Sequence, residues 1–272
     1  MSGNLRVETV RTDGFQMDYL RFGHGSRAFV ILPGLSVGSV LKFADSIAQA
    51  YSPLADHFSV YLFDRRKALP ETYSVYDMAR DTATAMRTLG LDHVCLFGAS
   101  QGGMIAMALT ADHPGLVGKL LLGSTAAFVD REYIEAIRQW IRLAEAGHAE
   151  ALYRAFGKAI YPQAVFEQSL DLLDAATKEV TNEDLERFII QAKALDGFDI
   201  TGRLPQIHCP VLVLGSRDDA VLGRSSSETL AAAFGESRNC MLHMYNGYGH
   251  AAYDLAPDYK QRLLQFCLQE SE

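Results

Sequence analysis

The sequence lacks any long hydrophobic run. No apolar stretch approaches the roughly 18 residues that a membrane-spanning helix needs. The first ten residues, MSGNLRVETV, carry charges at Arg6 and Glu8 and contain no apolar segment of the kind found in secretory signals. We therefore expect no membrane partner and a cytoplasmic location.

Cysteine is scarce and scattered. Cys95, Cys209, Cys240 and Cys267 form no C-x-x-C pair and no cluster with histidine at metal-site spacing. We interpret them as buried, reduced thiols rather than as disulfides. The first strand-like run is followed by no dinucleotide-binding G-x-G-x-x-G motif. The sequence therefore predicts an activity with neither cofactor nor metal.

A surplus of positive charge is also missing. Acidic residues outnumber basic ones by 33 to 25, the formal net charge is −8, and no run of Lys or Arg reverses this balance. Nucleic acid is therefore an unfavourable partner, as is an anionic membrane surface. The chain of 272 residues is 49% hydrophobic, which suits one large, well-cored globular domain with an insertion.

What is present is an alternation of strand-like and helix-like segments. The strand-like runs lie at 5–12, 15–22, 28–34, 58–64, 93–98, 117–124, 209–219 and 239–245. The helix-like segments between and after them lie near 42–56, 74–90, 101–113, 225–235 and 257–269. The first two strands are joined near Asp13-Gly14, a hairpin signal. The alternation predicts an α/β protein with a mostly parallel, eight-stranded sheet flanked by helices.

The alternation stops near residue 126. From there to about residue 203 only helix-like segments occur, at roughly 130–146, 148–159, 163–176 and 182–196. We predict a helical cap at 126–203, inserted into a core made of 1–125 and 204–272. The cap is rich in aromatic residues, most of which should pack internally while a few line an apolar pocket. These residues are Phe128, Tyr133, Trp140, Tyr153, Phe156, Tyr161, Phe166 and Phe188.

Ser100 is the candidate nucleophile. It lies in Gly98-Ala99-Ser100-Gln101-Gly102, which fits G-x-S-x-G between a predicted strand and a predicted helix. Small residues allow the sharp turn that holds a serine hydroxyl out toward a substrate. The turn also places Ser100 at a helix N-terminus, where free N–H groups favour the negative charge of an acyl-transfer transition state.

A serine nucleophile needs a base and an acid. His250 follows NGYG in a loop after the last predicted strand, whereas the other histidines lie within a strand, at element edges or in the cap. Asp218 and Asp219 both follow the strand that ends near Gly215, and one of them is expected to orient the histidine. The resulting order along the chain is Ser, Asp, His.

The loop 32–39, LPGLSVGS, is the candidate oxyanion loop. Gly34 lets its backbone turn, and the N–H of Leu35 is the expected donor. The second expected donor is the N–H of Gln101, directly after the nucleophile.

Through GASQGG, LPGLS, GSRDD and GYGH, the chain resembles the α/β-hydrolase fold family over nearly its whole length. It is most similar to compact bacterial members with a helical cap, such as enol-lactone hydrolases, esterases and carbon–carbon bond hydrolases. In that family the acid usually sits three residues after the strand-ending glycine, which implies Asp218. The family often has His-Gly where this chain has Pro33-Gly34, and a glycine-containing turn where it has FDRRKALPE. Haloalkane dehalogenases and epoxide hydrolases of this family are expected to have aspartate at the position of Ser100. The serine therefore excludes these two activities.

These observations predict a serine hydrolase that cleaves a small or medium carboxylic ester, thioester or lactone with an apolar portion. The predicted triad is Ser100, Asp218 and His250, and the reaction passes through an acyl-enzyme. Two alternatives remain open. One is hydrolysis of a carbon–carbon bond in a diketone by the same residues, and the other is a ligand-binding receptor that keeps the fold without turnover.

Overall fold

The computed structural model describes residues 5–235 and 240–269. The chain ends and residues 236–239, which include the first residue of the predicted strand 239–245, lie outside the described part. Within it, no helix has the length and apolar character required to cross a bilayer.

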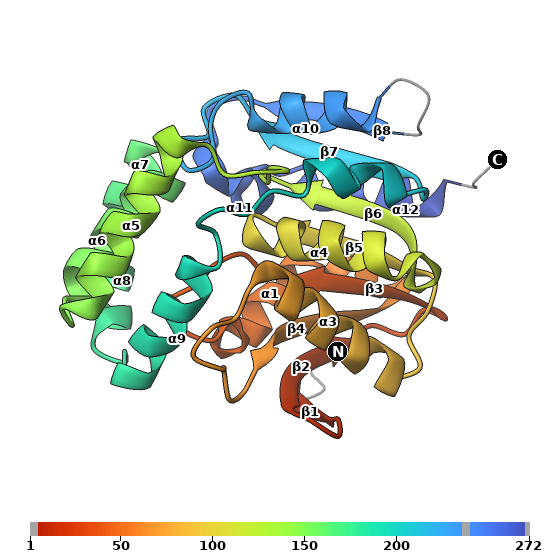
Figure 1. Ribbon diagram of the computed structural model, residues 1–272, viewed down its shortest axis with the longest axis horizontal. Coiled ribbons are helices and arrows are strands. Elements are labelled where there is room, and N and C mark those ends of the chain that lie inside the picture. The colour runs from red at the N-terminus through yellow and green to blue at the C-terminus, as the bar shows by residue number, and fades with distance from the viewer. Residues whose placement is uncertain (1–4, 236–239, 270–272) are drawn as a thin grey trace.

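An eight-stranded sheet forms the centre of the molecule (Figure 1), in the order β1-β2-β4-β3-β5-β6-β7-β8. β1 pairs antiparallel with β2 and β2 antiparallel with β4, while all later pairs are parallel. The predicted mostly parallel sheet is thus confirmed. The strands are β1 (Val7–Arg11), β2 (Gln16–Phe22), β3 (Arg27–Leu32), β4 (Phe58–Arg66), β5 (Val94–Ala99), β6 (Val117–Gly123), β7 (Val211–Ser216) and β8 (Cys240–Tyr245).

The central strands are apolar because both of their faces are buried. In β3, Phe29 and Ile31 belong to one hydrophobic cluster and Val30 and Leu32 to the other. Successive side chains of a strand point to opposite faces, so a continuous apolar run fills both layers. α3, α4 and α10 pack on one face, with their side chains in the cluster of Val30 and Leu32. α2 and α12 pack on the other face, in the cluster of Phe29 and Ile31.

Helices cover both faces and extend from one edge of the sheet. They are α1 (Ala44–Ala50), α2 (Ser52–Ala55), α3 (Val75–Thr88), α4 (Gln101–Asp112), α5 (Arg131–Glu145), α6 (Ala149–Ile160), α7 (Gln163–Gln168), α8 (Leu170–Thr177), α9 (Asn182–Lys193), α10 (Ser226–Phe234), α11 (Ala252–Leu255) and α12 (Tyr259–Leu268). Short 3₁₀ turns lie at Val40–Phe43, Pro114–Leu116, Thr201–Gln206 and Gly249–Ala251.

Two predicted helices are broken. The segment predicted at 42–56 consists of a 3₁₀ turn, α1 and α2, and Pro53 near the start of α2 has no N–H with which to continue the preceding helix. The segment predicted at 163–176 is divided at Ser169, whose hydroxyl donates to the carbonyl of Val165 at 2.8 Å. A serine that bonds back to the preceding turn commonly bends or ends a helix.

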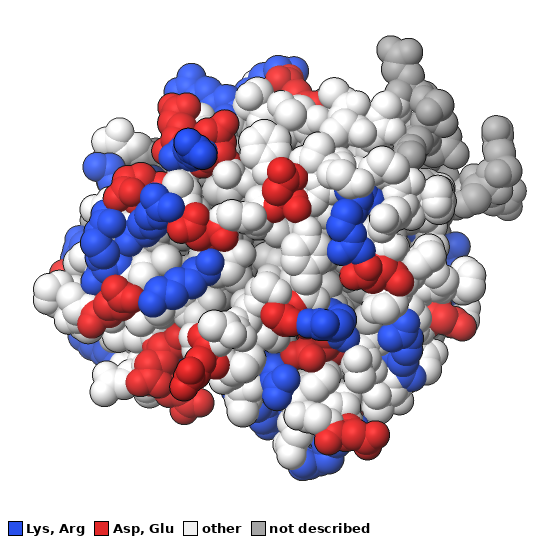
Figure 2. All heavy atoms as spheres, in the orientation of Figure 1, with Lys and Arg blue, Asp and Glu red and all other residues white. Residues whose placement is uncertain are grey.

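α5 to α9 lie together beside the sheet, between β6 and β7 in the chain (Figure 1). The two connections to the core run side by side, because Ile200 donates to the carbonyl of Ala127 at 2.8 Å. Trp140, Phe156 and Phe188 form the interior of this group through edge-to-face contacts. Figure 2 shows acidic and basic side chains interspersed over these helices. The division of the chain into a core and a cap at 126–203 stays a prediction; we call α5 to α9 the cap helices below.

Candidate active site

Ser100 lies at the sharp turn between β5 and α4. Its φ of 53° and ψ of −123° place a non-glycine residue in an uncommon backbone conformation. Its N–H donates to the carbonyl of Gly123 at 2.8 Å, and its own carbonyl accepts from the Thr125 hydroxyl at 2.7 Å. The neighbouring strand β6 and the loop after it therefore hold the turn from outside. Strained residues fixed in this way are frequent at functional sites.

The two glycines of the G-x-S-x-G motif are required by close backbone contacts. A Cβ on Gly98 would lie 2.2 Å from the carbonyl oxygen of Gly102. A Cβ on Gly102 would lie 2.0 Å from the carbonyl oxygen of Leu32, at the end of β3. Because the obstacles are backbone atoms, no side-chain movement relieves them. The motif therefore lets α4 begin against the end of β3, which brings Ser100 next to the loop after that strand.

His250 is held in the interior by one carboxylate. Its Nδ1 lies 2.8 Å from Oδ2 of Asp219, and both side chains are 2% exposed. A carboxylate accepts hydrogen bonds, so this contact assigns the ring proton to Nδ1 and leaves Nε2 as an acceptor. Oδ1 of Asp219 accepts from the N–H groups of Val221 and Leu222 at 2.8 and 3.0 Å. Both oxygens are thus engaged, and the imidazole orientation is fixed.

The expectation that Asp218 is this carboxylate is corrected by the geometry. Asp218 accepts from the Ser216 hydroxyl at 2.8 Å and from the N–H groups of Gly247 and Gly249 at 3.0 and 2.8 Å. It therefore fastens the loop that carries His250 to the end of β7. Desolvation acts to raise the pKa of Asp218, but these hydrogen bonds outweigh it and lower the pKa below the usual carboxyl value.

The strand end explains the correction. β7 continues one residue beyond Gly215, since Ser216 still pairs with Tyr245 of β8. Counting three residues from the glycine leads to Asp218, whereas the same count from the last strand residue leads to Asp219. The end of β7 is set by how far it pairs with β8, and the sequence of β7 alone does not reveal this.

The loop after β3 lies against Ser100. A Cβ on Gly34 would lie 3.1 Å from Cβ and 3.7 Å from Oγ of Ser100. Leu35 and Gly34 both line the cavity that contains Ser100. Gln101 is the first residue of α4, and the first N–H groups of a helix have no partner within it.

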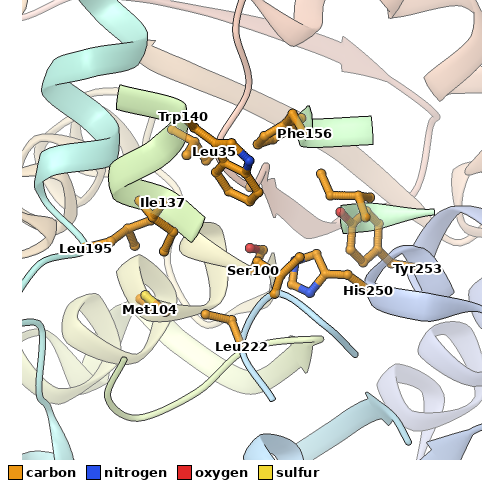
Figure 3. A pocket seen from close by; sticks show the side chains of 13 residues that line it. Leu35, Ser100, Met104, Ile137, Trp140, Phe156, Leu195, Leu222, His250 and Tyr253 are labelled. Carbon is orange, nitrogen blue, oxygen red and sulfur yellow. The ribbon is translucent and has the colours of Figure 1, made fainter. Parts of the chain in front are cut away.

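Ser100 and His250 line one cavity (Figure 3), where they lie next to each other. The other walls come from the loop after β3, the start of α4, the cap and the loop after β7 (Figure 3). Of the eight cap aromatics, Trp140 and Phe156 reach this cavity. Apart from Ser100 and His250, the polar side-chain groups among its lining residues are the indole N–H of Trp140 and the hydroxyl of Tyr253. Burial raises the pKa of Tyr253 well above 10, which keeps its hydroxyl protonated.

A second cavity adjoins the first at Leu222, which lines both. The space open to water-sized molecules is about 20 Å³ in the cavity lined by Ser100 and about 140 Å³ in the second. The second cavity lies between the start of α5, which contributes Tyr133, and α10. Among the residues described, no three His, Cys, Asp or Glu side chains gather as a metal site.

Comparison with known proteins identifies the family. A family model described as "Alpha/beta hydrolase family" matches residues 29–259. The chain therefore belongs to the α/β-hydrolase family, as its motifs predict, and it is a hydrolase of this fold.

Relatives and solved structures agree with this assignment. The chain is 29% identical to "Putative carbamate hydrolase RutD" of Serratia proteamaculans (strain 568) over 212 residues, covering 75% of this chain and 79% of that protein. It is 28% identical to the protein of the same name from Agrobacterium fabrum over 224 residues, covering 79% and 85%. The hydrolase MGS-M2 from a deep-sea metagenome superposes with a TM-score of 0.86 over 97% of this chain and 98% of its own, at 19% identity. The enol-lactonase from Burkholderia xenovorans LB400 superposes with a TM-score of 0.83 over 96% of this chain and 100% of its own, also at 19% sequence identity.

Proposed function

We propose that the protein is a serine hydrolase that cleaves a small, uncharged carboxylic ester, thioester or lactone through an acyl-enzyme. The observation that carries the proposal is the buried His250–Asp219 pair, in which His250 lines the same cavity as Ser100. An isolated serine at a tight turn has no means to lose its proton. A neutral imidazole with its tautomer fixed by a carboxylate is the base that such a serine needs.

The mechanism follows from these groups. Ser100 Oγ attacks the substrate carbonyl carbon while Nε2 of His250 accepts the hydroxyl proton. The tetrahedral oxyanion is held by the N–H groups of Leu35 and Gln101, and Asp219 stabilises the imidazolium. His250 then protonates the departing alcohol, thiol or ring oxygen as its bond to carbon breaks. Water, deprotonated by His250, attacks the acyl-enzyme, and Ser100 leaves with its proton restored.

The lining of the cavity supports an uncharged substrate. Its walls are mostly apolar, with Leu35, Ile137 and Trp140 facing the serine. Burying a carboxylate or ammonium group there without a charged partner is unfavourable. The cavity of about 20 Å³ holds about one water molecule, so any substrate requires the cap helices to move outward or side chains to rearrange.

A second candidate is carbamate hydrolysis. Relatives carrying that name match most of this chain at 26–29% identity, and a carbamate carbonyl presents the same carbon to Ser100. Carbon–carbon bond hydrolysis of a diketone is the other reaction open to the same groups. Substrate panels of esters, lactones, carbamates and diketones, with products identified by mass spectrometry, distinguish these reactions.

The decisive experiment uses a fluorophosphonate probe followed by peptide mapping. We expect a covalent adduct on Ser100 in the wild type and none in Ser100→Ala, with turnover of a chromogenic acetate ester lost in the same variant. A wild type that neither labels nor turns over any ester, lactone or carbamate would favour a ligand-binding receptor instead.

A further inference from the structure

Arg65 is a buried arginine without a buried counter-ion. It lies near the end of β4 and is 4% exposed. No carboxylate of the described residues is within ion-pair distance of its guanidinium, and its Nε has no hydrogen-bond partner there. Burial lowers the pKa of Arg65, with the nearby Asp64 acting in the opposite direction, yet an arginine keeps its charge in proteins. Burying this positive charge costs desolvation free energy, and holding the fold together does not account for that cost.

Its guanidinium joins the two segments that carry the proposed oxyanion donors. Nη2 donates to the carbonyl of Pro33 at 2.8 Å, two residues before Leu35. The same nitrogen lies 3.4 Å from Oε1 of Gln101, the residue after the nucleophile. Gln101 is fully buried, so water does not compete for this contact. One side chain therefore spans the oxyanion loop and the start of α4.

The bridge continues into the cap. Nε2 of Gln101 donates to the main-chain carbonyl of Gln191 in α9 at 2.7 Å. From the same helix, Nη1 of Arg187 donates to the carbonyl of Arg66 at 3.1 Å. α9 is thus attached to the residue after the nucleophile and to the strand end that carries Arg65. A movement of α9 is transmitted to both.

We propose that Arg65 is a positioning residue for the oxyanion hole. Its guanidinium holds the two donor segments at a fixed separation, places a positive charge beside them, and through Gln101 ties them to cap helix α9. The inference rests on the proposed serine-hydrolase function. Donors aligned before the reaction stabilise the developing oxyanion most effectively, and small displacements of such groups reduce rates strongly.

The test compares two substitutions of Arg65. Arg65→Met removes the positive charge and the N–H donors of the side chain, whereas Arg65→Lys keeps the charge but loses the planar guanidinium with its several N–H groups. Gln101→Met keeps the Gln101 N–H and removes both side-chain bonds. Arg66→Met is the matched control, because the Arg66 side chain contacts Ala68 and Asp81 rather than this bridge. We expect kcat for an ester to fall about 10- to 100-fold in Arg65→Met, with KM changing less than about threefold, and to fall less in Arg65→Lys.

An alkylboronic acid, which forms a tetrahedral adduct with an active serine, supplies the second readout. Its affinity should fall by the same factor as kcat/KM across wild type, Arg65→Met, Arg65→Lys and Gln101→Met, because it uses the same donors. If Arg65 had a purely structural role, its substitution would lower the melting temperature, but kcat and boronate affinity of the folded variants would equal those of Arg66→Met. That result would overturn the inference.

If Arg65→Met does not fold, kcat and boronate affinity of Arg65→Lys and Gln101→Met test the role of Arg65 instead. If the wild type neither reacts with a fluorophosphonate nor hydrolyses an ester, the proposed function fails and this inference fails with it. If the wild type is active and the Arg65 and Gln101 variants match it, only the role of Arg65 is overturned.

Discussion

Asp218 and Asp219 are adjacent residues of the same type, and the turn after β7 gives them different partners. Asp219 points inward to Nδ1 of His250, while Asp218 receives N–H groups from the loop that leads to His250. One carboxylate fixes the tautomer of His250, and the other fixes the backbone of the loop that carries it. Substituting each by asparagine, which preserves size, separates these two effects.

We expect Asp219→Asn to lower kcat by about 10⁴-fold, because an amide no longer selects the Nδ1–H tautomer or stabilises the imidazolium. Asp218→Asn should lower kcat less than about 10-fold, since the His250–Asp219 contact remains. Stopped assays on a chromogenic ester, with circular dichroism to verify folding, measure both. Equal losses in the two variants would contradict the separate roles.

Asp218 also predicts a pH dependence of stability. Its pKa in the folded protein is lowered from the ordinary value of 3.8, so the carboxylate favours the folded state above that value. This contribution is complete at neutral pH and is lost as the pH falls below 3.8 toward the lower folded-state pKa. Urea unfolding of wild type and Asp218→Asn should therefore differ most at neutral pH and converge in acid. A difference that grows as the pH falls would refute the assignment.

At the scale of elements, the strand–turn–helix unit around Ser100 depends on contacts between main-chain atoms. A methyl group on Gly102 would lie only 2.0 Å from the Leu32 carbonyl oxygen, well inside van der Waals contact. We expect Gly102→Ala to reduce the free energy of unfolding by about 3 kcal/mol, because β3 and α4 must separate. Gly115→Ala is the control: a Cβ there has no neighbour within 4 Å, and its effect should stay within about 0.5 kcal/mol. Urea titration compares them, and equal stabilities would refute the packing argument.

Elements with a local signal are predictable from the sequence. The apolar runs of β3 and β5 identify strands buried on both faces, and Ser74 with Asp77 forms the capping box at the start of α3 that their spacing indicates. The break at Ser169 is not predictable, because the residues around it still suit a helix. Arg65 is harder still, since its partners lie 32 and 36 residues away and only the sheet brings them together.

At the scale of the whole molecule, the site lies where the cap meets the core, and Leu222 divides the space between them. This side chain is 5% exposed and lines both the cavity that contains Ser100 and the larger cavity beside α10. The smaller cavity contains Ser100, so under the proposed function we expect the position of Leu222 to limit the length of an acyl or alcohol chain that fits. We therefore expect substrate size to depend on how the cap helices pack on the core rather than on Ser100, His250 and Asp219.

Leu222→Ala should join the two cavities and admit longer chains. We expect kcat/KM for a chromogenic octanoate ester to rise relative to the butyrate ester by about 10-fold or more, since each methylene placed in an apolar pocket favours binding by about 1–3 kcal/mol. Leu230→Ala is the matched control, because Leu230 lines only the second cavity and its truncation leaves the partition in place. Both variants should lose about 2–4 kcal/mol of stability as buried leucines shortened to alanine. An octanoate preference that rises equally in both variants would show that chain length is limited elsewhere than at Leu222.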